Sequence, residues 1–265
     1  MNPLIYFSFG MTKSGSTLSF ELARSAFVLA GLPQPRLSLN AVENRKKINF
    51  CKHIDEQQAR AIRNETREIG HPVAIKTHTR PDPEVVQMLE NNEAFAHATF
   101  RDPREIALSM LDHGRRSRAE GGKSFTEYKT VQDTVEDIKH QTNSLLAWLS
   151  LPNVRPLYYD DIAFDMKEAT MRLLNDLKVS ADVNAVMDMA CNDRFTQKNK
   201  AKKSRHIDEM PGDISTQFET IFAPMYELLI SKRSDYRNDG TPVLDPTIPL
   251  CDWSETTPLQ TGRNP

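Results

Sequence analysis

The stretch Leu4-Ile5-Tyr6-Phe7-Ser8-Phe9-Gly10, followed two residues later by Lys13-Ser14-Gly15-Ser16-Thr17, decides the fold of this chain. The first part is rich in aromatic and β-branched residues and ends at a glycine, which predicts a buried strand. The second part is small and polar, and it leads into residues 18–30, where apolar side chains recur at helical spacing. A strand, a tight loop and a helix N-terminus direct backbone N–H groups and the positive end of the helix dipole at one point. The stretch therefore predicts a phosphate-binding loop, to which Lys13 adds a positive charge.

The position of the lysine separates this loop from the Walker A motif. In that motif the lysine stands directly after the last glycine and directly before Ser or Thr. Lys13 instead stands two residues before Gly15. On its own the segment is also compatible with an ordinary turn, rich in glycine and serine, that leads into a helix.

Length and charge narrow the class of protein. A chain of 265 residues with 38% hydrophobic residues fits one large α/β domain better than two small ones. We expect residues 1–240 to form that domain and residues 241–265 to form a proline-rich tail. The net charge of −2 gives no argument for nucleic acid or a membrane surface as a partner, so any anion must be bound by a local cluster of charge.

The cysteines and the absence of long apolar segments predict the cellular compartment of the protein. Cys51, Cys191 and Cys251 are odd in number, far apart and in no metal-ligand spacing, which favours reduced thiols and no metal site. No signal peptide and no membrane-spanning helix are predicted. We therefore expect a soluble, cytoplasmic protein.

Strand and helix patterns alternate along the chain. We expect strands at residues 4–10, 71–77, 94–100 and 154–159. We expect helices at residues 18–30, 55–69, 83–90, from 103 onward, 130–149, 167–177, 183–190 and 214–230, with basic loops at 114–123 and 198–205. This alternation predicts an α/β fold of three layers, α/β/α, with a central parallel sheet. Ligands of such sheets bind beyond the carboxyl ends of the strands.

The triplet Lys76-Thr77-His78 ends the second predicted strand. A lone histidine at a strand end is more often a surface residue with its hydrogen bonds satisfied than a catalyst. If this strand lies beside the first one, His78 faces the phosphate loop. A neutral imidazole there is suited to take a proton from a hydroxyl group.

A third segment joins Arg101, at the end of the third strand, to Ser109, two turns into the following helix. An Arg guanidinium and a Ser hydroxyl together suit a phosphate group. Taken alone, the segment also fits a helix start that is capped by Asp102 and has an exposed arginine. The basic residues of the 198–205 run are usually a solvated surface, but with Arg101 they would close over a second phosphate. No acidic residue follows the third strand in the position that would hold magnesium.

These segments, in this order, resemble the cytosolic type of sulfotransferase, which uses 3′-phosphoadenosine 5′-phosphosulfate (PAPS). Residues 13–17 match the loop that holds the 5′-phosphosulfate in that family, and His78 stands where its Lys-Thr-His triplet carries the catalytic base. Arg101 and Ser109 match its 3′-phosphate motif, and Tyr159, followed by two acidic residues, is also typical. The match runs from about residue 4 to residue 215.

The chain departs from the family pattern at two positions beside the loop and in one later segment. Thr12 replaces a proline, and Leu18 replaces the aromatic residue that often stacks on adenine. Among relatives a phenylalanine supplies such a ring from elsewhere, and Phe195 is the residue that would do so here. The late Arg-Lys-Gly segment of the family is only partly present, at Arg205, and its Gly-Asp-Trp is present without the tryptophan.

The resemblance implies a P-loop-containing, sulfotransferase-like fold and sulfuryl transfer from PAPS to a hydroxyl or amine of a small-molecule or carbohydrate acceptor, without a metal. It implies that His78 is the base and that Lys13 and Lys76 assist. The donor-binding residues it implies are Lys13, Ser14, Gly15, Ser16, Thr17, Arg101, Ser109, Tyr159, Phe195 and Arg205. Two alternatives stay open: a P-loop kinase or NTPase, which needs magnesium and ATP, and a catalytically silent nucleotide-binding protein of the same fold. The sequence predicts neither the acceptor nor the oligomeric state.

Overall fold

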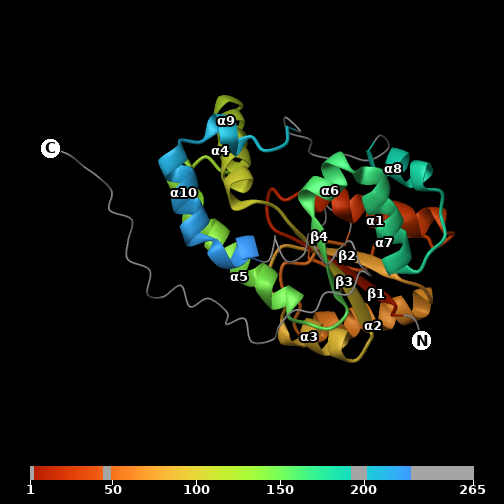
Figure 1. Cartoon of the computed structure of the whole chain (residues 1–265). Helices are drawn as coiled ribbons and strands as arrows, with labels where there is room; N and C mark the ends of the chain where they lie inside the picture. Colours follow the sequence, from red (N-terminus) through yellow and green to blue (C-terminus); the bar gives the residue numbers. More distant parts are fainter. Residues whose placement is uncertain (1–2, 44–48, 192–201, 228–265) are drawn as a thin grey trace.

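The computed structural model describes residues 3–43, 49–191 and 202–227 of the chain. Within these ranges a parallel sheet of four strands forms the centre of the molecule (Figure 1). Its strands are β1 (Ile5–Gly10), β2 (Val73–Thr77), β3 (Ala94–Phe100) and β4 (Val154–Tyr158), in the spatial order β2-β1-β3-β4. The predicted neighbourhood of the first and second strands is confirmed.

The register of the strands brings their carboxyl ends to one edge of the sheet. Phe9 of β1 lies opposite Thr77 of β2, and Gly10 lies opposite Thr99 of β3. The residues that follow β1, β2 and β3 therefore leave the sheet at the same level. This edge gathers the predicted site from segments that lie far apart in the sequence.

Helices cover both faces of the sheet, and the predicted three-layer fold is confirmed (Figure 1). Along β1, Ile5, Phe7 and Phe9 belong to one hydrophobic core and Tyr6 to the other, because successive side chains of a strand point to opposite faces. The Tyr6 side of the sheet is covered by α1 (Ser16–Leu29), α7 (Met166–Leu177) and α8 (Val183–Cys191). The other side is covered by α2 (Glu56–Ile69), α3 (Pro83–Glu90) and α5 (Val135–Leu149), the last preceded by the short η1 (Gln132–Thr134).

Trp148 of α5 is the largest side chain of this second core, and it links the core to the end of β2. Its ring stacks on Phe9 with 5.5 Å between the ring centroids. Its Nε1–H donates a hydrogen bond of 2.9 Å to the carbonyl oxygen of Thr79. The buried indole thus holds the segment just after His78 against the sheet.

Three further helices extend the molecule beside the carboxyl edge of the sheet. They are α4 (Pro103–Ala119), α9 (His206–Glu209) and α10 (Gly212–Ile221), and Figure 1 shows α9 and α10 beside α4. The remaining helix, α6 (Tyr159–Phe164), joins β4 to α7. The structure thus contains α6 and α9, which the sequence patterns did not predict.

The predicted loop at residues 114–123 is wrong for residues 114–119, because α4 continues to Ala119, and right for residues 120–123. Gly114 does not end the helix. A Cβ atom at Gly114 would lie 2.2 Å from the carbonyl oxygen of Phe125, so this glycine lets the following loop approach the helix closely. Arg118 holds the same loop in place by donating hydrogen bonds to the carbonyl oxygens of Thr126 and Tyr128, at 2.8 and 3.1 Å.

Two predicted boundaries also differ. The fourth strand ends at Tyr158, and Tyr159 opens α6. The helix predicted at residues 214–230 corresponds to α10, which spans Gly212–Ile221, and to a further helical stretch at 223–227; residues 228–230 lie outside the described part of the chain. The proposed tail at residues 241–265 lies outside the described part of the chain.

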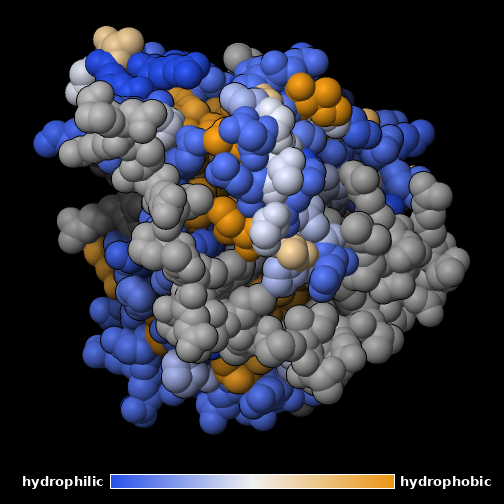
Figure 2. Space-filling model, turned by 60° about the vertical axis from the view of Figure 1, so that its left-hand side comes forward, coloured by the Kyte–Doolittle hydropathy of each residue, from blue (hydrophilic) through white to orange (hydrophobic). Residues whose placement is uncertain are grey.

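One face of the molecule is mainly polar where the structure describes it (Figure 2). Hydrophilic residues dominate the face shown in Figure 2, and hydrophobic residues occupy small areas between them. In residues 3–43, 49–191 and 202–227, no helix is both long and apolar enough to cross a lipid bilayer. Cys51 is buried and Cys191 partly buried, both as free thiols.

Candidate active site

The loop between β1 and α1 turns through two residues in the left-handed region of backbone space. Lys13 has a φ of 67° and Gly15 a φ of 81°. The buried hydroxyl of Ser14 fixes the loop by donating to the carbonyl oxygens of Met11 and Thr99, at 2.7 and 3.1 Å. Gly15 is the N-cap of α1 and brings no capping side chain, and the first turn contains no acidic residue. The positive end of α1 therefore keeps its capacity to bind an anion.

Lys13 stands in a positively charged environment at this loop. Burial lowers the pKa of its ammonium group, and the charges of Arg116 and Arg101 lower it further, to about 8, against an opposing effect of Asp112. Its Nζ lies 3.2 Å from Nδ1 of His113 on α4. A lysine surrounded by cations gains most when a negative charge arrives or develops beside it.

Lys76 and His78 approach the same loop from the end of β2. The Nζ atom of the buried Lys76 donates a hydrogen bond of 2.9 Å to Oγ1 of Thr17, in the first turn of α1. The Nδ1 atom of His78 lies 2.7 Å from the carbonyl oxygen of Gly10. Because a carbonyl oxygen only accepts, Nδ1 carries the proton of this hydrogen bond. In the neutral ring the lone pair is then on Nε2, which is the tautomer a general base needs.

Arg101 leaves the end of β3 and is almost completely buried. Its guanidinium carbon lies 4.0 Å from the ring centroid of Tyr159, and its Nη2 forms an ion pair of 3.1 Å with Glu105. Its Nη1 also donates a long hydrogen bond of 3.5 Å to the carbonyl oxygen of Lys13. The Nε atom is buried and has no hydrogen-bond partner among the described residues. Ser109 is buried two turns farther along α4.

Tyr159 connects Arg101 to the phosphate loop. A Cβ atom at Gly15 would lie 2.7 Å from Cδ2 of Tyr159, so the tyrosine ring packs directly on the glycine. The ring thus touches the loop on one side and the guanidinium of Arg101 on the other. A glycine at position 15 is required for this packing as well as for the positive φ.

Arg205 is placed differently from the other predicted donor-binding residues. It is 2% exposed and forms ion pairs of 2.8 Å with Asp112 and 2.7 Å with Glu209. Two carboxylates therefore already neutralise the guanidinium. Phe195 and the lysines at positions 198 and 200 lie outside the described residues.

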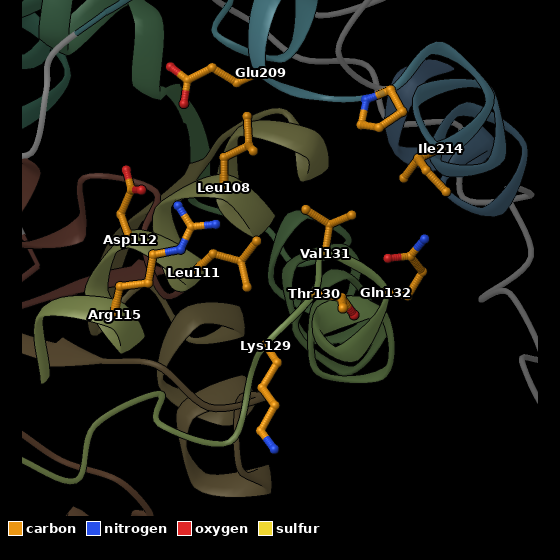
Figure 3. A pocket seen from close by; sticks show the side chains of 11 residues that line it. Leu108, Leu111, Asp112, Arg115, Lys129, Thr130, Val131, Gln132, Glu209 and Ile214 are labelled. Atoms are coloured by element: carbon orange, nitrogen blue, oxygen red, sulfur yellow. The ribbon is translucent and has the colours of Figure 1, made fainter. Parts of the chain in front are cut away.

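A cavity of about 280 Å³ lies beside this ion-pair cluster. Figure 3 shows Leu108, Leu111, Asp112 and Arg115 of α4 on one side of it, with Val131 and Ile214 on another. None of the predicted catalytic or donor-binding residues lines this cavity. Among the described residues, no group of three or more His, Cys, Asp or Glu side chains could hold a metal ion.

Two residues at the loop were missed in the sequence. His113 contacts Lys13, and Oε1 of Gln141 on α5 accepts a hydrogen bond of 2.5 Å from the backbone N–H of Thr12. His113 directly precedes Gly114 and lies inside the helix that was predicted from residue 103 onward, but the sequence does not show that this face of the helix meets Lys13. The available signal was its spacing, since His113 follows the proposed phosphate-binding Ser109 by four residues and so lies on the same side of α4.

Comparison with solved structures identifies the fold. Retinol dehydratase, in complex with androsterone and the inactive cofactor PAP, superimposes with a TM-score of 0.53 at 15% identity, over 84% of this chain and 81% of that one. A mouse sulfotransferase complexed with PAP gives 0.53 at 12% identity, over 84% of each chain. The sulfotransferase domain from the curacin biosynthetic pathway gives 0.51 at 13% identity, over 85% of this chain and 98% of that one.

Comparisons of sequence add nothing to this result. No family model matches the chain, and no curated protein matches it. At 12–15% identity the structural likeness establishes the fold alone. The chain therefore has the fold of PAPS-dependent sulfotransferases, and the resemblance noted in its motifs is confirmed at that level.

Proposed function

We propose that this chain is a sulfotransferase that moves a sulfuryl group from PAPS to a hydroxyl or amine of a small-molecule or carbohydrate acceptor. One observation carries the proposal. Lys13, Lys76 and His78 meet around a single loop at the carboxyl edge of a parallel sheet, and a contact to a different neighbour holds each of them. The solved sulfotransferases that share the fold support the same conclusion, since two of those compared were crystallised with PAP.

The residues at this edge fit a nucleotide with phosphate groups at both ends. In the proposal, the loop N–H groups and Lys13 bind the 5′ end, and Arg101 with Ser109 binds the 3′-phosphate. The buried Nε atom of Arg101, which has no partner in the described part of the chain, offers a donor for that phosphate. Bound PAPS supplies the sulfuryl group and a good leaving group. We keep Tyr159, Phe195 and Arg205 as further proposed donor-binding residues.

His78 acts in this proposal as the general base. The hydrogen bond from its Nδ1 to the carbonyl oxygen of Gly10 fixes the ring and leaves the lone pair on Nε2. Nε2 takes the proton of the acceptor hydroxyl as its oxygen attacks the sulfur. A positioned base of this kind contributes roughly 100- to 10,000-fold to the rate.

Lys13 and Lys76 stabilise the negative charge that develops during transfer. Lys13 is proposed to neutralise the departing phosphate oxygen, and Lys76, through its place beside Thr17, to assist at the sulfuryl oxygens. One well-placed donor of this kind lowers the barrier by about 3 kcal/mol. Since side-chain cations perform this role, the proposed mechanism uses no metal.

A sulfuryl-transfer assay with radiolabelled PAPS tests the base. His78→Ala should lower the turnover number by roughly 100-fold or more while the affinity for adenosine 3′,5′-bisphosphate (PAP) stays near that of the wild type. His140→Ala, at an exposed histidine of α5, is the matched control and should keep full activity. Unchanged turnover of the His78→Ala protein would remove the histidine from the mechanism.

A thermal-shift comparison of PAP with ATP and magnesium separates the alternatives. Stabilisation by PAP alone supports the sulfotransferase, and stabilisation by ATP and magnesium alone points to a kinase or NTPase. Binding of PAP without turnover on any tested hydroxyl or amine acceptor points to a silent nucleotide-binding protein. Ligand binding to the native state raises the melting temperature by mass action, so the assay does not require knowledge of the acceptor.

A further inference from the structure

His113 of α4 is in direct contact with the ammonium group of Lys13. Its Nδ1 lies 3.2 Å from Nζ of Lys13, across 100 residues of sequence. The imidazole is held by an edge-on contact with Phe125, at 5.0 Å between ring centroids and an interplanar angle of 75°. The same phenyl ring lies 5.8 Å from Nζ of Lys13. Lysine and histidine thus share one aromatic support.

The charges around this pair determine which partner carries the proton. The charges of Arg116 on α4 and of Glu120, the C-cap of that helix, act on His113. Lys13 experiences the charges of Arg116, Arg101 and Asp112. Burial lowers the pKa of His113, and the positive charges of Lys13 and Arg116 lower it further. The ring is therefore neutral near pH 7, while Lys13, with a pKa of about 8, is mostly charged. Under these conditions the ammonium donates and Nδ1 accepts.

We propose that His113 is a positioning residue, whose neutral imidazole accepts a hydrogen bond from Lys13 and directs the ammonium group toward the anion that the phosphate loop binds. This inference rests on the proposed sulfuryl transfer, in which Lys13 neutralises the leaving oxygen. A lysine has a flexible stem with four carbons, and a fixed acceptor beside it reduces the freedom that must be lost before transfer. His113 itself touches neither donor nor acceptor in this role.

The proposal has a consequence at acidic pH. Protonation of His113 removes the acceptor and places a second positive charge 3.2 Å from Lys13. Protonation of His113 should then lower the activity, in addition to any loss at the proposed base. The acid limb of log(kcat/KM) should therefore be steeper in the wild type than in a variant whose residue 113 cannot titrate.

Two substitutions separate positioning from structure. His113→Asn keeps an oxygen acceptor near the place of Nδ1 and cannot titrate, whereas His113→Phe keeps a ring against Phe125 and removes the acceptor. We expect His113→Phe to lower kcat about 10- to 100-fold with a smaller change in the KM for PAPS. We expect His113→Asn to recover most of the activity, with a shallower acid limb than that of the wild type. Wild-type kcat in the Phe variant, equal losses in both variants, or an acid limb that neither variant changes would overturn the proposal.

A second measurement does not depend on turnover. The pKa of Lys13 can be followed by NMR in protein with ¹³C-labelled lysine, with the signal assigned through Lys13→Arg. His113→Phe should lower that pKa by about half a unit or more, because the charged form loses an acceptor, and His113→Asn should leave it near the wild-type value. A wild type without sulfuryl transfer overturns the proposed function. An active wild type, in which His113→Phe changes neither kcat nor the pKa of Lys13, overturns the positioning role alone.

Discussion

Replacement of Gly15 by alanine tests the packing on which the phosphate loop depends. Gly15 combines a φ of 81° with a tyrosine ring in direct contact. The new methyl group would lie 2.7 Å from Cδ2 of Tyr159, which is closer than real Cβ contacts come. Either the loop or the ring must move, and the ring also stacks on Arg101 at 4.0 Å. We therefore expect Gly15→Ala to reduce both stability and affinity for PAP.

A second glycine of the same chain isolates the contribution of the ring. Gly31 has a φ of 79°, and a Cβ atom there would meet nothing within 4 Å, so Gly31→Ala carries the backbone strain alone. That strain amounts to about 1–2 kcal/mol, and overpacking against Tyr159 adds about 1–3 kcal/mol to Gly15→Ala. With the lower values, and about 2–4 °C per kcal/mol, the melting temperature falls by about 2–4 °C for Gly31→Ala and about 4–8 °C for Gly15→Ala.

Differential scanning fluorimetry and calorimetric titration with PAP measure the two effects. Gly31→Ala should keep wild-type affinity for PAP, and Gly15→Ala should lose about tenfold or more, since 1.4 kcal/mol of strain on binding corresponds to that factor. A Gly15→Ala, Tyr159→Ala double variant should recover part of the lost stability. Equal melting temperatures and equal affinities for the two alanine variants would refute the packing argument.

Three other substitutions test the charges and the packing around the site. The alkaline limb of kcat/KM should lie near pH 8, because Lys13 loses its charge as the pH rises through its pKa of about 8. In Lys13→Arg this limb should move above roughly pH 9. A limb that does not move contradicts the assignment of this ionisation to Lys13. Burial alone would raise the pKa of Asp102, but its hydrogen bonds and charge pairing with Arg104 hold it below the ordinary value. The stabilisation is therefore present at neutral pH and lost as the pH falls through the acid range below 3.8. Asp102→Asn should cost about 1.5–3 kcal/mol in urea unfolding at pH 7 and less at pH 3, whereas an equal loss at both values contradicts the ion-pair explanation. Gly114→Ala places a Cβ atom 2.2 Å from a backbone carbonyl oxygen and should lower the free energy of unfolding by about 1–3 kcal/mol. Gly212→Ala is the control, because a Cβ atom there would lie in open space. Equal melting temperatures of the two variants contradict the close approach of the Phe125 carbonyl to α4.

The parts of the fold that local patterns encode were predicted correctly. The run 4–10 contains a fully buried strand, and the small polar residues after it lead directly into a helix. The end of β2 lies next to β1, so Lys76 and His78 reach the loop as the parallel topology predicts. Their roles in catalysis stay predictions.

The parts that were missed depend on contacts between segments far apart in the sequence. Gly114 resembles a helix end in the sequence, but its function is to admit the carbonyl of Phe125, which no local pattern shows. The contact between His113 and Lys13 joins residues that lie 100 positions apart, and no local pattern shows it either. The ion pairs of the buried Arg205 with Asp112 and Glu209 likewise join α4 to the start of α9, and no local pattern shows them; the role of Arg205 in donor binding stays a prediction.

The indole of Trp148 gives this chain an internal optical probe. The ring is 1% exposed, stacks on Phe9 at the sheet edge and donates a hydrogen bond to the carbonyl oxygen of Thr79, next to the proposed base. The sequence contains a single other tryptophan, Trp253. In a Trp253→Phe protein all indole fluorescence comes from Trp148, so movement of the segment after β2 can be followed by emission, without a label and before the acceptor is known.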